Sequence, residues 1–344
     1  MKINAALTSE AQMRRRTYLV ASILAALIII VFFISMNTGQ IKLSPQEVIS
    51  SLFGAGTKQQ ELILWEFRLP RIVISVLIGA GLAISGCILQ GITRNALADP
   101  GILGINSGAG LVIALFIAYV PLTTAVPVFL LPLMAFLGAA ATAALIYALA
   151  YKKRDGISTS SLLLTGIAVT AGINAAMIVL TLRLNPADFQ RIATWLAGSI
   201  WGTTWKFVFA LLPWIVLLIP YVLYKARTLD VLNLGETTAT GLGAPVKREQ
   251  LLLIAASVAL AGASVAVSGG IGFVGLIGPH LARRLVGPRH RYLMPVTALT
   301  GALLVLIADT VGRVILHAGE VPTGIVVAVI GAPYFLYLMA RSKA

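Results

Sequence analysis

Apolar runs of about 20 residues alternate with short polar segments along almost the whole chain. A run of this length is sufficient to cross a bilayer as a helix. Because lipid offers no partners to backbone N–H and C=O groups, helices are expected rather than open sheet. The pattern predicts ten membrane-spanning helices, at Tyr18–Met36, Ile72–Ile92, Gly101–Val120, Pro127–Ala150, Ser160–Leu182, Trp205–Tyr224, Leu251–Val267, Ile271–Val286, Met294–Leu316 and Thr323–Met339.

Two of these runs need separate interpretation. The first follows a polar, basic stretch, but it is longer than the apolar region of a signal peptide and has no small-residue cleavage site, so we interpret it as a retained helix. The eighth is the shortest and is interrupted by glycines. The domain organisation expected is an N-terminal tail (1–17) and one ten-span domain (18–340). Within that domain, an external segment (38–70) and a cytoplasmic loop (227–247) stand out.

The composition agrees with an integral membrane protein. The 344 residues are 58% hydrophobic and 11% charged, against roughly 25% charged residues in soluble domains. The net charge of +14 does not indicate nucleic acid, because most basic residues lie in short loops beside apolar runs, where they match topology signals and anionic lipid. Cys87 is the single cysteine, which excludes an internal disulfide framework, and its apolar run favours simple packing.

The basic residues also orient the chain. With the N-terminus in the cytoplasm, 18 of the 26 Lys and Arg residues fall inside, as the positive-inside rule requires. Both termini are then cytoplasmic, in a multi-pass membrane protein. Arg68 and Arg71 form a compact basic pair on the outside. They are interpreted either as a docking site for an external partner or as side chains that snorkel to the lipid interface.

Glycine is frequent, with 32 residues, and is often spaced for close helix contact, as at Gly79, Gly81 and Gly86. Small residues allow helix backbones in a membrane to approach one another and pack by van der Waals contact. The spacing therefore predicts a large and tightly packed helix bundle.

The predicted spans contain few ionisable groups. Asp309 and Arg313 are four residues apart, so they share one helix face and are expected to pair. A carrier driven by protons or sodium, the alternative class of transporter, would place acidic or histidine side chains near the midplane and show inverted repeats. His280, His290 and His317 instead lie at or near helix ends, where structural roles are expected rather than metal ligation.

The cytoplasmic loop 227–247 predicts two short helices. Gly235 and Gly243 are typical helix stops, and Asp230 is a candidate cap for a helix start. Helices of about two turns are marginal alone in water, so they need a surface, either a cytoplasmic partner protein or the bilayer. The chain has no Gly-Lys-Ser/Thr phosphate loop, so ATP chemistry would require another polypeptide.

From about residue 46 to the C-terminus the chain resembles the permease subunits of the iron-siderophore, haem and cobalamin importers, the FecCD–BtuC type of ABC transporter. The resemblance rests on the order of several short segments along the chain, more than on any single motif. The matching segments are Arg68–Arg71, Asn95–Gly108, Trp195–Ser199, Leu234–Gly243, Gly272–His280, Ala308–Arg313, Glu320–Gly324 and Gly331–Pro333.

The resemblance implies an all-α, ten-helix permease of the type II importer fold, paired with a second permease subunit as a homodimer or heterodimer. It also implies two cytoplasmic ATP-binding subunits and an external substrate-binding (lipo)protein. The cargo is expected to be an iron(III)–siderophore, with cobalamin and haem as alternatives. Because the iron would arrive as a chelate, no metal ligand, cofactor or catalytic residue is expected in this chain.

The resemblance also implies roles for particular residues. The residues expected to dock the binding protein are Arg68, Arg71 and Arg313, although Arg313 has Asp309 as a competing partner. The residues expected to couple to the ATPase are Leu234, Gly235, Glu236, Ala239 and Gly243. The translocation pathway is assigned to Asn174, Gly198, Ser199, Trp201 and Thr203, for which ordinary bundle packing is the alternative.

Overall fold

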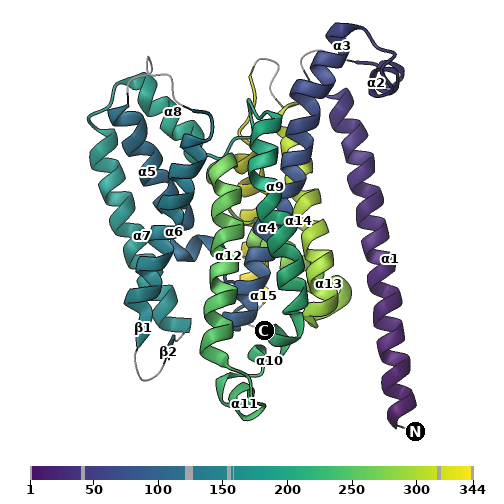
Figure 1. The fold of residues 1–344 in the computed structure, drawn as a ribbon, viewed down its shortest axis with the longest axis vertical. Coiled ribbons are helices and arrows are strands. Elements are labelled where there is room, and N and C mark those ends of the chain that lie inside the picture. Colours follow the sequence, from purple (N-terminus) through teal and green to yellow (C-terminus); the bar gives the residue numbers. More distant parts are fainter. Residues whose placement is uncertain are drawn as a thin grey trace.

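The computed structural model describes residues 2–39, 43–120, 127–152, 156–157, 159–315 and 319–341, which are predominantly helical (Figure 1). The elements are α1 Lys2–Asn37, α2 Pro45–Leu52, α3 Lys58–Leu62, the π-helix η1 Ile63–Arg68, α4 Leu69–Thr93, the 3-10 helix η2 Pro100–Leu103, α5 Ile105–Tyr119, α6 Leu130–Ala150, β1 Tyr151–Lys152, β2 Gly156–Ile157, α7 Thr159–Thr181, α8 Pro186–Leu196, α9 Trp205–Tyr224, α10 Ala226–Asn233, α11 Glu236–Gly241, α12 Val246–Ser268, α13 Val274–Val286, α14 His290–Gly312 and α15 Thr323–Arg341.

Each of the ten predicted spans has a matching helix, which confirms the all-α membrane architecture. Within the described part of the chain, seven helical segments are long and apolar enough to cross a bilayer, while α5 and α15 are shorter apolar helices. The shortest of the ten is α13, with 13 residues. At 1.5 Å per residue, α13 covers about 20 Å of a hydrocarbon core of about 30 Å.

Some predicted boundaries were wrong, because backbone geometry rather than hydropathy sets them. The eighth span was expected from Ile271, but α13 begins at Val274, after Phe273 adopts the left-handed conformation with φ 64°. The third span was expected from Gly101, but Gly104, with φ 66°, separates η2 from α5. The N-terminal tail is helical from Lys2 and continuous with the first span. The ninth span was predicted to end at Leu316, which lies outside the described residues.

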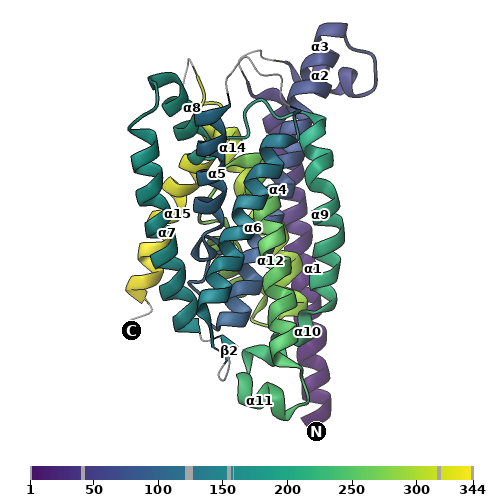
Figure 2. The ribbon, with the colours of Figure 1, turned by 60° about the vertical axis from the view of Figure 1, so that its left-hand side comes forward.

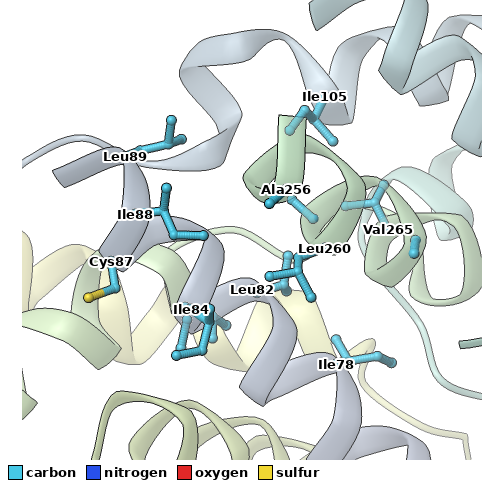
Figure 3. Packing of buried hydrophobic residues seen from close by; sticks show 14 of the residues in the cluster. Ile78, Leu82, Ile84, Cys87, Ile88, Leu89, Ile105, Ala256, Leu260 and Val265 are labelled. Carbon is cyan, nitrogen blue, oxygen red and sulfur yellow. The ribbon is translucent and has the colours of Figure 1, made fainter. Parts of the chain in front are cut away.

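The helix α4 lies at the centre of the bundle and packs against α12, α13 and α14. Glycines allow these contacts: a Cβ on Gly79 would lie 2.2 Å from the carbonyl oxygen of Gly301, and one on Gly86 would lie 1.9 Å from that of Gly275. The predicted close packing is therefore confirmed at these two positions. Around them, Ile78, Leu82, Ile84, Cys87 and Ile88 are buried in the same apolar core (Figure 3).

The bundle has two distinct ends. One end, which we call the α8 end, carries α2, α3 and α8 and lies at the top of Figure 1. The opposite end, which we call the α11 end, carries α10, α11 and the short antiparallel pair β1–β2. At the α8 end, a capping box fixes α2, because the Glu47 carboxylate accepts from the Ser44 backbone N–H at 2.7 Å, which lowers the pKa of Glu47.

Candidate functional site

A cavity of about 460 Å³ at the α8 end is lined by all three arginines singled out in the sequence. Arg68 ends the π-helix η1, Arg71 lies in the first turn of α4, and Arg313 follows α14 directly. Trp201 and Thr203, two of the predicted pathway residues, line the same cavity. Elements far apart in the sequence therefore meet around one positively charged hollow, which we call the arginine cavity.

Arg71 is held by two carboxylates. Its Nη2 lies 2.8 Å and its Nε 2.9 Å from Asp309 Oδ1, while its Nη1 lies 2.7 Å from Glu320 Oε2. Thr323 Oγ1 also donates to Asp309 Oδ1 at 3.2 Å. The side chain of Asp309 is fully buried. Arg71 thus joins the start of α4 to α14 and to the segment before α15, with the fork geometry in which guanidinium groups bind carboxylates best.

Arg313 makes the pair that the sequence spacing predicted, but as the longer of two contacts to the same acid. Its Nη2 lies 3.3 Å from Asp309 Oδ2, and it also donates to the backbone oxygens of Ser35 and Thr38 at 3.3 Å each. It forms a further hydrogen bond with the Ser35 hydroxyl. Its side chain is buried, so the expected alternative, an internal pair with Asp309, is present in this structure.

Arg68 is buried as well, and it donates to the backbone oxygen of Met36 at the end of α1. Three guanidinium groups and the two carboxylates of Asp309 and Glu320 therefore meet around the arginine cavity, and the ion pairs join these acids to Arg71 and Arg313, which leaves an excess of positive charge. The π-helix that ends at Arg68 is of interest because such turns are rare and often occur at functional sites. Chemically, the cavity is suited to accept a further carboxylate.

The predicted pathway residues do not form one cluster. Gly198 has φ 75°, and its carbonyl oxygen accepts the backbone N–H of Gly324 at 2.9 Å. It also packs against Gly270, so it joins the end of α8 to the start of α15 and to the segment before α13. Trp201 is 74% exposed. Ser199 lines a second cavity at the α8 end, which Trp201 also reaches. Asn174 lies apart on the exposed side of α7 and lines neither cavity.

At the α11 end, the predicted two-helix loop is present. Gly235, with φ 105°, separates α10 from α11, and Gly243, with φ 81°, follows α11. Glu236 opens α11 and is exposed, whereas Ala239 is fully buried against the bundle. The predicted helix stops and the position of the acid are confirmed.

The prediction for Asp230 was wrong. It lies within α10 rather than at its start, and its Oδ1 accepts from the backbone N–H of His290 at 2.9 Å and contacts His290 Nδ1 at 2.7 Å. The carboxylate thus caps α14, a contact that spans 60 residues of sequence. His290 therefore has a structural role. The ring of His280 packs edge-on against Tyr334, with the ring centroids 5.8 Å apart. His317 lies outside the described residues.

The loop is anchored to the bundle but presents apolar side chains. Lys225 Nζ donates to Glu249 Oε1 at 2.8 Å, which ties the start of α10 to α12 and raises the pKa of Lys225. Leu234 and Leu242 are 60% and 63% exposed at either side of α11. Exposed apolar residues on a short, anchored loop are typical of a protein contact surface.

Sequence reasoning missed the role of Glu320, which it noted only as part of a motif. Its contact with Arg71 spans 249 residues. A local pattern cannot report such a contact, and the only available signal was an acidic residue in a loop at the predicted outer side.

Comparisons with known proteins agree with these features. The profile of the FecCD transport family matches residues 27–341. The chain is 48% identical to the iron(3+)-hydroxamate import system permease protein FhuG of Bacillus subtilis, over 94% of this chain and 97% of that protein. It is 37% identical to the hemin transport system permease protein HmuU of Yersinia pestis, over 94% of this chain and 96% of that protein.

A solved structure supports the fold. It is described as an inward-facing conformation of a metal-chelate type ABC transporter, and it matches with a TM-score of 0.83 and 32% identity, over 94% of this chain and 99% of that chain. The described helices of the present chain therefore follow the arrangement of a known ABC permease.

Proposed function

The chain belongs to the FecCD transport family, and on this premise we propose that it is the permease subunit of an ATP-driven importer of iron(III)–siderophore complexes. The observation that carries the proposal is the 48% identity, over nearly the full length of both chains, to an iron(3+)-hydroxamate permease. Transport would proceed by alternating access, in which the bundle opens to one side of the membrane and then to the other. Haem remains the second candidate cargo, because a hemin permease is 37% identical, and cobalamin the third.

The proposed complex contains a second permease subunit, two ATP-binding subunits and an external binding protein. In support of a second permease, only 11% of the most apolar stretch of α7 is buried within this chain, which leaves most of that stretch available to a partner subunit. Supporting separate ATPases, the sequence has no phosphate-binding loop. The positive-inside rule favours cytoplasmic termini, which would place the α11 end in the cytoplasm and the α8 end outside.

In this complex, the arginine cavity would accept acidic side chains of the binding protein. Three guanidinium groups line it, and two of them, Arg71 and Arg313, pair with the internal carboxylates of Asp309 and Glu320, so a third carboxylate improves the charge balance. Arg68, Arg71 and Arg313 all line the cavity, so an incoming acid would bind among the three guanidinium groups. A buried charge pair across an interface typically costs about 2–5 kcal/mol to break.

The α10–α11 loop would couple the permease to an ATPase. The exposed Leu234 and Leu242 provide apolar contacts, and Glu236 at the start of α11 adds a charge that complements the helix dipole. Gly235 and Gly243 fix the loop shape, and Ala239 anchors it to the bundle. If Glu236→Arg assembles with the ATPase and transports at the normal rate, this placement is incorrect.

The cargo would pass along small and apolar surfaces, with its iron already enclosed by the chelator. Ser199, Trp201 and Thr203 lie at the two cavities of the α8 end and are the best supported pathway residues, whereas Gly198 has a packing role and Asn174 depends on a partner beside α7.

The cargo is tested by uptake of radioiron into cells that express the chain with its cognate ATPase and binding protein. Uptake of an iron(III)–hydroxamate that is sensitive to vanadate, and that exceeds uptake of ferric citrate and of haem iron, supports the proposal. Uptake that ignores vanadate and follows the proton or sodium gradient indicates an ion-coupled carrier instead. Stronger uptake of haem iron would reassign the cargo.

The docking role is tested by uptake and by binding-protein affinity in Arg68→Glu and Arg71→Glu. Both variants are first checked for normal abundance in the membrane and normal thermal unfolding, because both side chains are largely buried. Normal uptake and normal docking in two folded variants would remove the arginine cavity from the mechanism.

A further inference from the structure

A second hollow lies beside the arginine cavity, with Trp201 in the walls of both, and runs along α6, α9 and α12. It begins as a cavity of about 530 Å³ at the α8 end and continues into one of about 190 Å³ deeper in the bundle. The two cavities share Pro132, Ala266 and Val267 in their walls, so they adjoin each other, and we call the pair the groove. The three helices lie side by side in Figure 2.

The groove changes in polarity along its length. At the α8 end its wall includes Gln190, Arg191 and Thr194 of α8 together with Trp195. Deeper, the wall consists of apolar residues, among them Phe136 and Trp214, whose rings pack with centroids 4.9 Å apart. The groove is therefore amphipathic, with hydrogen-bond donors and a positive charge at one end and an aromatic, apolar channel at the other.

The surface beside the groove is suited to a bilayer. Leu133 of α6 is 52% exposed, and Phe209 and Leu217 of α9 are 62% and 70% exposed. Within the helix α9, only 22% of the most apolar stretch is buried in this chain. Acyl chains of the leaflet at the α8 end therefore reach the side of the groove along these exposed apolar positions of α6 and α9.

Arg191 places a positive charge at the mouth of the groove. The side chain of Arg191 is 43% exposed, and among the described residues it forms an ion pair with Asp188 of the same helix, with Nη1 3.5 Å from Oδ1. A guanidinium group presents five N–H donors in a planar fork that matches a phosphate, so Arg191 retains donors beyond this pair. Trp195 and Trp201 add indole rings at the same level, where tryptophan is typical of a membrane–water interface.

We propose that this groove binds an anionic phospholipid, with the phosphate at Arg191 and one acyl chain along Pro132, Ala263 and the Phe136–Trp214 pair. Its wall includes Ser199 and Trp201, which are also proposed pathway residues, but the test below measures lipid contact rather than uptake, so its outcome does not depend on the transport function proposed above. It also gives a role to Arg191, a basic residue on the predicted outer side that binding-protein docking does not involve. The bound lipid fills the space between α6 and α9.

The test uses the full chain in lipid nanodiscs and the fluorescence of Trp214. Phosphatidylglycerol or phosphatidylcholine with brominated acyl chains is titrated into unlabelled zwitterionic lipid, and Trp214→Phe identifies the part of the quenching that comes from the groove. A single arginine near the surface predicts half-quenching at about fivefold lower mole fraction of the anionic lipid. Arg191→Gln should bring the two curves together.

Arg183→Gln is the matched control, because Arg183 is also exposed at the α8 end but does not line the groove. It should preserve the preference for the anionic lipid. Equal quenching by both headgroups in the wild type, or a preference that persists in Arg191→Gln, would overturn the proposal and leave bulk lipid as the occupant. A Trp214 that neither lipid quenches would also overturn it, because a protein partner would then cover the groove.

Discussion

The two ends of the bundle present opposite chemistry. At the α8 end, the guanidinium groups of Arg68, Arg71 and Arg313 are largely buried and held by carboxylates and backbone oxygens. At the α11 end, Leu234 and Leu242 are mostly exposed on a short loop. The α8 end therefore buries charged side chains, whereas the α11 end exposes apolar side chains.

This difference separates two kinds of contact. A partner at the arginine cavity must supply charge and fit a preformed polar network, which favours specificity and rapid, salt-dependent association. A partner at the α10–α11 loop gains mainly from apolar burial, which depends little on salt and favours a permanent assembly. The contrast agrees with a binding protein that arrives and leaves and an ATPase that stays.

The largest effect is expected for Asp309→Asn. The substitution preserves shape but removes the charge that Arg71 and Arg313 share, so Arg71 keeps only the carboxylate of Glu320, and Arg313 keeps only hydrogen bonds such as those to Ser35 and Thr38. Removing one partner of a buried ion pair typically costs about 3–5 kcal/mol. Unfolding of the purified chain in a denaturing detergent measures the loss.

Asp188→Asn is the control for that measurement, because the Asp188–Arg191 pair is a surface pair at 3.5 Å. It should lower the free energy of unfolding by no more than about 1 kcal/mol. An equal loss of unfolding free energy in Asp309→Asn and Asp188→Asn would mean that the buried network around Asp309 contributes no more to stability than a surface ion pair.

A smaller effect is expected at the other end. Leu234→Asp and Leu242→Asp place a charge on the exposed apolar surface of the loop, so each should weaken ATPase assembly by about 2 kcal/mol, or roughly 30-fold. The stability of the isolated permease should not change, since both side chains are mostly exposed. Co-purification of the ATPase across a concentration series measures the affinity.

Phe53→Asp serves as the control, because Phe53 is 86% exposed at the end of α2, at the opposite end of the bundle. It should leave ATPase assembly unchanged. If Phe53→Asp weakens assembly as much as Leu234→Asp, the effect reflects general damage and the contrast between the two ends is lost.

The smallest effect compares two glycines of the same loop. Gly243 has φ 81°, whereas Gly241 lies within α11, and an added Cβ would meet nothing within 4 Å at either position. Gly243→Ala should therefore cost about 1–2 kcal/mol from backbone strain alone. Gly241→Ala should be neutral or slightly stabilising, as alanine is the better helix former. Thermal unfolding of both variants tests this difference.

Most of the fold follows from local signals in the sequence. Apolar runs of bilayer length predicted every long helix, and Gly235 and Gly243 marked the ends of the loop helices, because hydropathy and positive φ are properties of short segments. The same reasoning failed at Phe273, a bulky residue in a left-handed conformation that no propensity predicts. It also failed at Asp230, whose partner is on another helix.

The candidate site was predicted only in part, for the same reason. The spacing of Asp309 and Arg313 indicated their pair, and the basic residues at 68 and 71 indicated a charged feature at that end. The contact of Arg71 with Glu320, and the burial of the three arginine side chains, depend on segments that are far apart in the sequence and meet in space. Neither composition nor periodicity reports such tertiary proximity.

The central claim is that the arginine cavity receives acidic side chains of a binding protein during iron-chelate import. The most direct measurement is the affinity of the cognate binding protein for the reconstituted complex with Arg68→Glu, alone and with acidic residues of the binding protein changed to arginine. We expect docking to be at least roughly 30-fold weaker in Arg68→Glu alone. Docking and uptake should be restored when one acidic residue of the binding protein is changed to arginine. Wild-type affinity in a folded Arg68→Glu complex would contradict it.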